Sequence, residues 1–135
     1  MLVREYTPAD LDSLRRMHAS QGFDYPFPDL SDPIFISKLV VEDDSDRAVI
    51  ASLARLTCEI YLLIDRESGE RNPRERWSQL LALHAAGERD LLARGLDDAH
   101  AWLPPQIARR FGRRLESLGW LRDDRWTPYC KILRR

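Results

Sequence analysis

The clearest fold signal in the chain is Phe111-Gly112-Arg113-Arg114-Leu115-Glu116-Ser117-Leu118-Gly119-Trp120. Together with Ile107, its apolar residues recur at helical spacing, which predicts an amphipathic helix opening at Pro104-Pro105. Gly119 suits the end of that helix, because glycine readily adopts the left-handed conformation of a helix C-terminus. The segments 120–122 and 128–133 then predict a final antiparallel strand pair.

The N-terminal end of the sequence predicts a strand followed by a helix. Residues 2–6 alternate apolar and polar side chains, as a half-buried strand does. Thr7 is a good N-cap, Pro8 suits the first helical position, and Gly22 is placed to end the helix.

Three strands are predicted in the middle of the chain, at Lys38–Glu42, Ala48–Leu56 and Thr57–Asp65. The turn chemistry of residues 43–46 separates the first two. The second is a nearly continuous apolar run, which predicts a strand covered on both faces. We expect the second and third to form a hairpin, although no strong turn signal lies between them.

A long helix is predicted from Pro73 to Arg94, closed by Gly95, and then a strand at 98–103. The expected fold is therefore α/β (α+β), a single domain over residues 1–135. Its mixed, mostly antiparallel central sheet would be flanked by helices, in the order β-α-loop-β-β-β-α-β-α-β-β.

Composition fits this interpretation and excludes several classes of protein. The chain has 135 residues, 44% of them hydrophobic, and a formal net charge of −1. No apolar run approaches the roughly 20 residues needed to cross a bilayer. The near-zero net charge argues against a nucleic-acid or membrane-surface partner. Cys58 and Cys130 lie apart in apolar segments, which predicts buried free thiols, no metal site and a cytoplasmic location.

The element order and two local segments resemble the GNAT family of N-acetyltransferases. The segment 111–120 is similar to the family's closing helix and Leu-Gly-aromatic turn, with Trp120 as the aromatic residue. The segment 3–11 is similar to its opening strand and Thr/Pro/Asp-capped helix. The resemblance covers essentially the whole chain and implies an acyl-CoA-dependent N-acyltransferase that uses acetyl-CoA and acts on a small-molecule or peptide amine.

The resemblance also implies where coenzyme A would bind. The strand before the long helix would contact the pantetheine arm, and the following loop would bind the pyrophosphate through backbone N–H groups. In one register Arg66-Glu67-Ser68-Gly69-Glu70-Arg71 forms this loop, and in the other Asn72 to Trp77 does, without any glycine. The implied cofactor-binding residues are Leu63, Ile64, Asp65, Arg71, Arg74, Arg76, Trp77 and Ser78. The arginines are equally open to a second interpretation, as a solvated helix start.

The catalytic groups are harder to place. Glu59 on the strand before the long helix is the candidate general base, with Glu42 second; a polar residue on an open sheet face is the alternative for Glu59. Where family members carry a tyrosine as general acid, this chain has Leu115, so Tyr129 or Tyr61 would substitute. The three histidines form no evident pair and read as structural.

The loop at 23–33 interleaves Phe23, Tyr25 and Phe27 with prolines. It is either a wall of the acceptor site or a flap packed on the core. A second functional hypothesis is an inactive GNAT-like binding or interaction module that does not bind coenzyme A. A homodimer is left open as an assembly.

Overall fold

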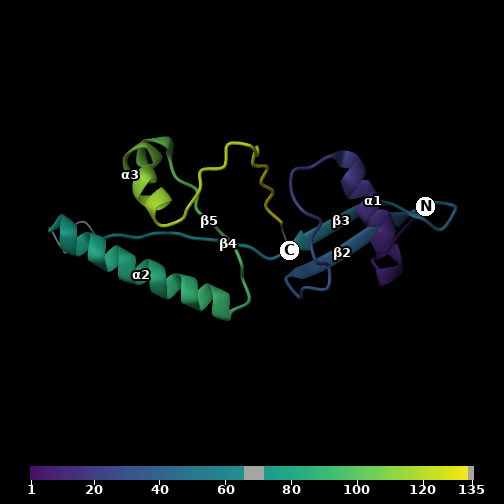
Figure 1. Cartoon of the computed structure of the whole chain (residues 1–135), viewed down its shortest axis with the longest axis horizontal. Helices are drawn as coiled ribbons and strands as arrows, with labels where there is room; N and C mark the ends of the chain where they lie inside the picture. The colour runs from purple at the N-terminus through teal and green to yellow at the C-terminus, as the bar shows by residue number, and fades with distance from the viewer. Residues whose placement is uncertain (66–71, 134–135) are drawn as a thin grey trace. The chain divides into compact units, whose positions relative to one another are not determined.

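The computed structural model describes residues 1–65 and 72–133 and has a mixed α/β architecture (Figure 1). Two compact units divide the chain, Met1–His100 and Ala101–Arg135. The elements, in chain order, are β1 (Leu2–Glu5), a single 3₁₀ turn (Pro8–Asp10), α1 (Leu11–Gln21), β2 (Phe35–Glu42), β3 (Ala48–Arg55), β4 (Cys58–Glu59), α2 (Pro73–Ala93), β5 (Ala99–His100) and α3 (Pro105–Ser117).

The first three strands form an antiparallel sheet in the order β1-β2-β3. Val3 lies opposite Val41, and Val40 lies opposite Ala51. Helix α1 lies against β3, as Figure 1 shows, and ends where Gly22 takes the predicted left-handed conformation with φ 69°. The predicted strand and helix at the N-terminus are confirmed.

The buried core lies between this helix and this sheet. Its fully buried members come from α1, the following loop, β2 and β3, and they are Leu14, Leu30, Val40 and Ala48. Several half-buried side chains pack around them, including Met17, Phe27 and Phe35.

A charged cluster ties β1 to the start of α1 and to β2. The guanidinium of Arg4 donates two hydrogen bonds of 2.8 Å to the buried carboxylate of Asp10 and also pairs with Glu42. The Thr7 backbone N–H donates to the same Asp10 carboxylate at 2.9 Å. The hydrogen bond from Arg4 is the main cause that lowers the pKa of Asp10 to about 2. Glu42, the second candidate base, is therefore part of a structural ion cluster.

The predicted hairpin between the second and third middle strands is wrong. Strand β4 pairs with β5 in parallel, with Cys58 opposite Ala99, and it comprises only Cys58–Glu59. The chain turns toward β5 because polar side chains flanking β4 bind the residues before β5, as described below. The β4–β5 pair is a second, separate sheet, so the single central sheet is not observed among the described residues.

The other strand predictions were wrong in part. Strand β3 is not covered on both faces, because Val49 and Ile50 are exposed. The strand predicted at 98–103 contracts to Ala99–His100.

The final strand pair is also absent: residues 120–133 form no strand. Leu121 and Ile132 are almost fully exposed, and a strand needs a neighbour to satisfy its backbone and cover its side chains. The prediction of two buried thiols is also wrong, because Cys130 is exposed and Cys58 is only half-buried.

The long helices follow the sequence closely. Helix α2 ends one residue before the predicted position, and Gly95 follows with φ 84°. Helix α3 ends at Ser117, and Gly119 follows with φ 90°, next to Trp120, whose N–H donates to the Leu115 carbonyl at 3.1 Å. Neither helix contains a fully buried residue. Within the described ranges, no helix is long and apolar enough to cross a membrane.

Candidate functional site

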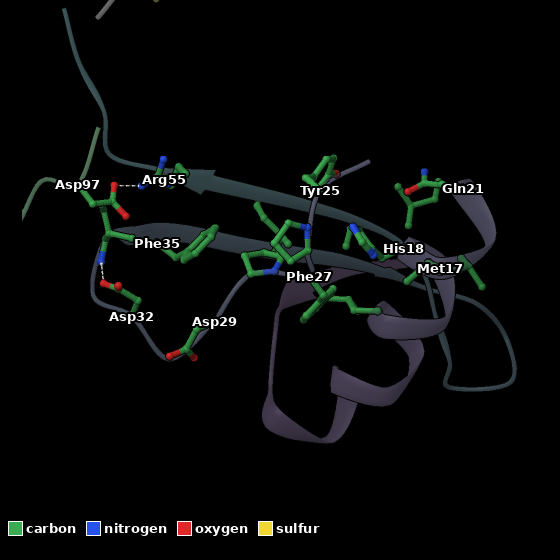
Figure 2. A pocket seen from close by; sticks show the side chains of 18 residues that line it. Met17, His18, Gln21, Tyr25, Phe27, Asp29, Asp32, Phe35, Arg55 and Asp97 are labelled. Atoms are coloured by element: carbon green, nitrogen blue, oxygen red, sulfur yellow. Dashed lines mark hydrogen bonds and ion pairs between the residues drawn. The ribbon is translucent and has the colours of Figure 1, made fainter. Parts of the chain in front are cut away.

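A groove of about 950 Å³ runs along the N-terminal unit (Figure 2). Its walls come from α1, from the loop between α1 and β2, and from β3. Figure 2 shows His18, Tyr25 and Phe27 near one end and Arg55 with Asp97 at the other. The groove is therefore aromatic at one end and charged at the other.

The aromatic loop at 23–33 both lines the groove and packs on the core, which are the two alternatives predicted for it. Phe27 packs on the core, while Tyr25 lines the groove and is 43% exposed. The His18 ring contacts both rings edge-on, at centroid distances of 4.9 Å to Tyr25 and 5.6 Å to Phe27. Phe23 stacks on Tyr25 and does not line the groove, so its role as a substrate contact is indirect.

Two carboxylates of the same loop, Asp29 and Asp32, also line the groove. Each accepts a backbone N–H two residues further on, from Ser31 at 3.0 Å and from Ile34 at 2.9 Å. The Ser31 hydroxyl and backbone hold the pKa of Asp29 below its usual range. The two acidic side chains thus satisfy backbone N–H groups of their own loop.

The charged end of the groove is a cluster between β3 and β5. Arg55 pairs with Asp97 and donates to Asp98 at 2.9 Å, and the Thr57 hydroxyl donates to Asp98 at 2.8 Å. Burial raises the pKa of Asp98, but the hydrogen bond from Thr57 and the positive charge of Arg55 outweigh it and lower the pKa. Asp98 is therefore ionised at neutral pH.

The β4–β5 pair adjoins this cluster and carries the candidate base. Glu59 lies exposed directly opposite His100 in the parallel register, and His100 Nε2 lies 3.5 Å from an oxygen of Asp98. The Ile60 N–H donates to the His100 carbonyl at 2.8 Å, after which residues 61–65 carry no assigned strand. Hydrogen bonding to Glu59, and the charge of that carboxylate, raise the pKa of the Tyr61 phenol.

The start of α2 includes one of the two predicted phosphate-loop registers, residues 72–77. Asn72 is the N-cap and its side chain accepts the Arg74 N–H at 2.9 Å, while Pro73 occupies the first turn and has no N–H. The Arg76 N–H donates to the Asn72 carbonyl at 3.0 Å. In the register that uses 72–77, these residues are the cap and first turns of a helix and not a loop, so phosphates would meet the start of α2. The glycine-containing register, 66–71, lies outside the described residues.

The other described residues that were predicted to contact the cofactor lie in the extended segment before α2 or in the first turns of α2. Leu63 and Ile64 lie in the extended segment before α2 and are exposed, and Asp65 follows them. Arg74, Arg76, Trp77 and Ser78 all belong to α2, and Arg71 lies outside the described residues.

Tyr129, the predicted acid, is 94% exposed in the C-terminal unit. Tyr61, its alternative, is the tyrosine that hydrogen bonds with Glu59. The structure therefore brings Tyr61, rather than Tyr129, to the candidate base.

Sequence reasoning missed the pairing of Asp98 with His100. The available signal was the Asp-x-His spacing in a predicted strand, since alternate strand residues share a face. Its relation to Glu59 depends on the parallel register, which the sequence does not display.

Comparisons of the chain with models of known protein families, with curated proteins and with solved structures found no match. Among the described residues, no group of three or more His, Cys, Asp or Glu side chains is arranged to hold a metal ion.

Proposed function

We propose that the chain is an acyl-CoA-dependent N-acyltransferase of GNAT-like design with an atypical phosphate site. The observation that carries the proposal is the parallel β4–β5 pair, whose strands are connected by α2. The ladder ends at the Ile60–His100 hydrogen bond. Past that bond, residues 61–64 lie in no strand of the described chain, so an extended ligand could bind along their backbone.

The extended run at 60–65 is suited to the pantetheine arm of the cofactor. Leu63 and Ile64 offer exposed apolar side chains, and the backbone N–H and C=O groups of residues 61–64, which lie in no strand of the described chain, could contact the amides of a ligand. Pantetheine carries two amides on an aliphatic chain, which match these two kinds of contact.

The phosphates would lie at the start of α2. The positive end of the helix dipole favours an anion there, and Arg74 and Arg76 add two guanidinium groups in the first turns. Because Asn72 and the proline occupy the first backbone positions, side chains supply more of this site than backbone N–H groups do.

The acceptor amine would lie in the groove, with Tyr25 and Phe27 as its aromatic wall. An ammonium group is attracted by aromatic faces and by carboxylates such as Asp29 and Asp32. Amines therefore fit this groove better than anionic acceptors do.

Calorimetric titration with acetyl-CoA tests the proposal. We expect saturable binding, weakened about tenfold or more by the double change Arg74→Ala and Arg76→Ala, since charge-assisted phosphate contacts are lost. The matched control changes Arg109 and Arg110 of α3 to Ala and leaves the affinity unaltered. Absence of binding at millimolar acetyl-CoA would contradict the proposal.

A second candidate, a GNAT-like interaction module without coenzyme A, is favoured by the self-capped start of α2. There the Arg74 N–H, which could bind a phosphate, is already bonded to Asn72. This candidate predicts no heat of binding for acetyl-CoA and the same thermal stability with and without it. Ligand-dependent stabilisation that is lost in the double arginine variant would exclude it.

A further inference from the structure

Four titratable side chains gather on one face where β4 meets β5. Glu59 and His100 face each other across the parallel register. Tyr61 follows Glu59 by two residues and Asp98 precedes His100 by two, and alternate residues of an extended chain point to the same face. Two contacts join them in pairs, Tyr61 with Glu59 and His100 with Asp98.

Asp98 is held so that it can orient an imidazole. One carboxylate oxygen accepts the Thr57 hydroxyl at 2.8 Å, and the other accepts Arg55 at 2.9 Å and lies 3.5 Å from His100 Nε2. A fixed carboxylate beside one ring nitrogen selects the tautomer with the proton on that nitrogen. The lone pair of His100 is then on Nδ1, and the side chain is 53% exposed and within reach of a ligand.

We infer that His100 is a second proton-transfer residue of the site, accepting the proton of the attacking amine on Nδ1, with Asp98 as its positioning residue and Glu59 as the neighbouring carboxylate. This inference rests on the proposed acyltransferase function. It assigns a role to a histidine that the sequence pattern presents as structural.

The step balances without any further reactant. The amine nitrogen forms a bond to the thioester carbonyl carbon, and the proton that the nitrogen loses passes to His100. The carbon–sulfur bond then breaks, and the imidazolium returns that proton to the departing thiolate. The products are the amide and free coenzyme A, and His100 is restored to its starting form.

The charges around the imidazole come from both sides of the site. Arg55 at the end of β3 and Asp97 before β5 pair with each other, and Asp98 accepts from the same arginine. On β4, Glu59 faces the ring and Tyr61 donates to Glu59. The Asp98 carboxylate, 3.5 Å from His100 Nε2, would attract the positive charge that the ring gains when it accepts the proton.

The test measures thiol release from acetyl-CoA between pH 5.5 and 9, with butylamine and spermidine as acceptor probes. We expect kcat of His100→Gln to fall on the order of 100-fold and the limb that reports a histidine ionisation to disappear, with KM for acetyl-CoA unchanged. Asp98→Asn should keep the protein folded, lower kcat and change the His100 tautomer seen by nitrogen-15 NMR. His84→Gln on α2 is the matched control and should leave the pH profile unaltered.

The outcomes distinguish the proposed role of His100 from the proposed acyltransferase function. Acetyl-CoA binding with an unchanged pH profile in His100→Gln, or with the same His100 tautomer in Asp98→Asn, overturns the role of His100 and leaves the acyltransferase proposal standing. Failure of the wild-type protein to bind acetyl-CoA overturns both. Binding without thiol release from either amine also overturns the assignment of His100.

Discussion

The sheet β1–β3 with α1 and the β4–β5 pair are held together by different forces. Every fully buried residue among those the structure describes lies between residues 10 and 48, in or beside the first sheet. The β4–β5 pair has none, and polar side chains fasten it instead, through Arg55 and Thr57 on one side and Asp97 and Asp98 on the other. Apolar burial thus stabilises one region, while directional bonds position the other.

This difference matters for function, because a site needs exposed, oriented groups. Glu59 and His100 lie on the polar pair, where neither is buried. The first sheet contributes a rigid frame and the aromatic end of the groove. Stability and candidate chemistry can therefore be changed separately in this chain, and mutations can test that separation.

The largest expected effect on the free energy of unfolding comes from shortening a side chain in the buried core. Leu14 is 3% exposed, so Leu14→Ala should lower the free energy of unfolding by about 3 kcal/mol, through lost burial and the cavity left behind. Leu92→Ala on α2, where the side chain is 66% exposed, should change it by less than about 0.5 kcal/mol. Urea unfolding followed by circular dichroism gives both values. If both variants lost the same free energy of unfolding, the contrast between the buried core and the exposed side chain on α2 would be contradicted.

A smaller effect is expected from the ion cluster that fastens β1 to α1. Asp10 has an ordinary pKa of 3.8 and a folded pKa of about 2, lowered chiefly by Arg4. A carboxyl whose pKa is lower in the folded state stabilises the fold above its unfolded pKa. The charged form of Asp10 therefore stabilises the fold by about 2 kcal/mol at neutral pH, and Asp10→Asn should remove that contribution.

The pH dependence distinguishes this bond from a simple packing defect. The difference between wild type and Asp10→Asn should shrink as pH falls from about 5 toward 2, because wild-type Asp10 then becomes protonated as well. Asp12→Asn, two residues further on and exposed, is the control. A gap that stays constant from pH 7 to pH 3 would mean that the charge of Asp10 contributes nothing.

Local signals were sufficient to predict the first region. The strand at Leu2–Glu5, the capped helix after it and the glycine at its end depend on neighbours within a few residues. The ends of α2 and α3 were predictable for the same reason, because Gly95 and Gly119 have left-handed backbones that few other residues accept. Each of these features is determined by residues within a few positions of it in the sequence.

The second region depends on pairing, which apolar patterns do not specify. Residues 60–64 have the apolar composition of a strand, yet only Cys58–Glu59 is one, since a ladder requires a partner in register. Glu59 could be proposed as a base from its position alone. The approach of His100 to it could not, because that follows from the parallel alignment of two short strands 40 residues apart.

The smallest expected effect isolates backbone conformation in the helical connection between β4 and β5. Gly87 lies inside α2 and Gly95 follows its C-terminus with φ 84°, and an added Cβ would meet no atom within 4 Å at either site. Gly87→Ala should stabilise the protein by about 0.5–1 kcal/mol through helix propensity, whereas Gly95→Ala should destabilise it by about 1 kcal/mol. Thermal unfolding of the two variants measures the opposite shifts. Helix α2 buries no side chain completely. If both variants shifted the melting temperature in the same direction, packing rather than local backbone preference would set the stability of α2. The contrast with the first sheet would then fail.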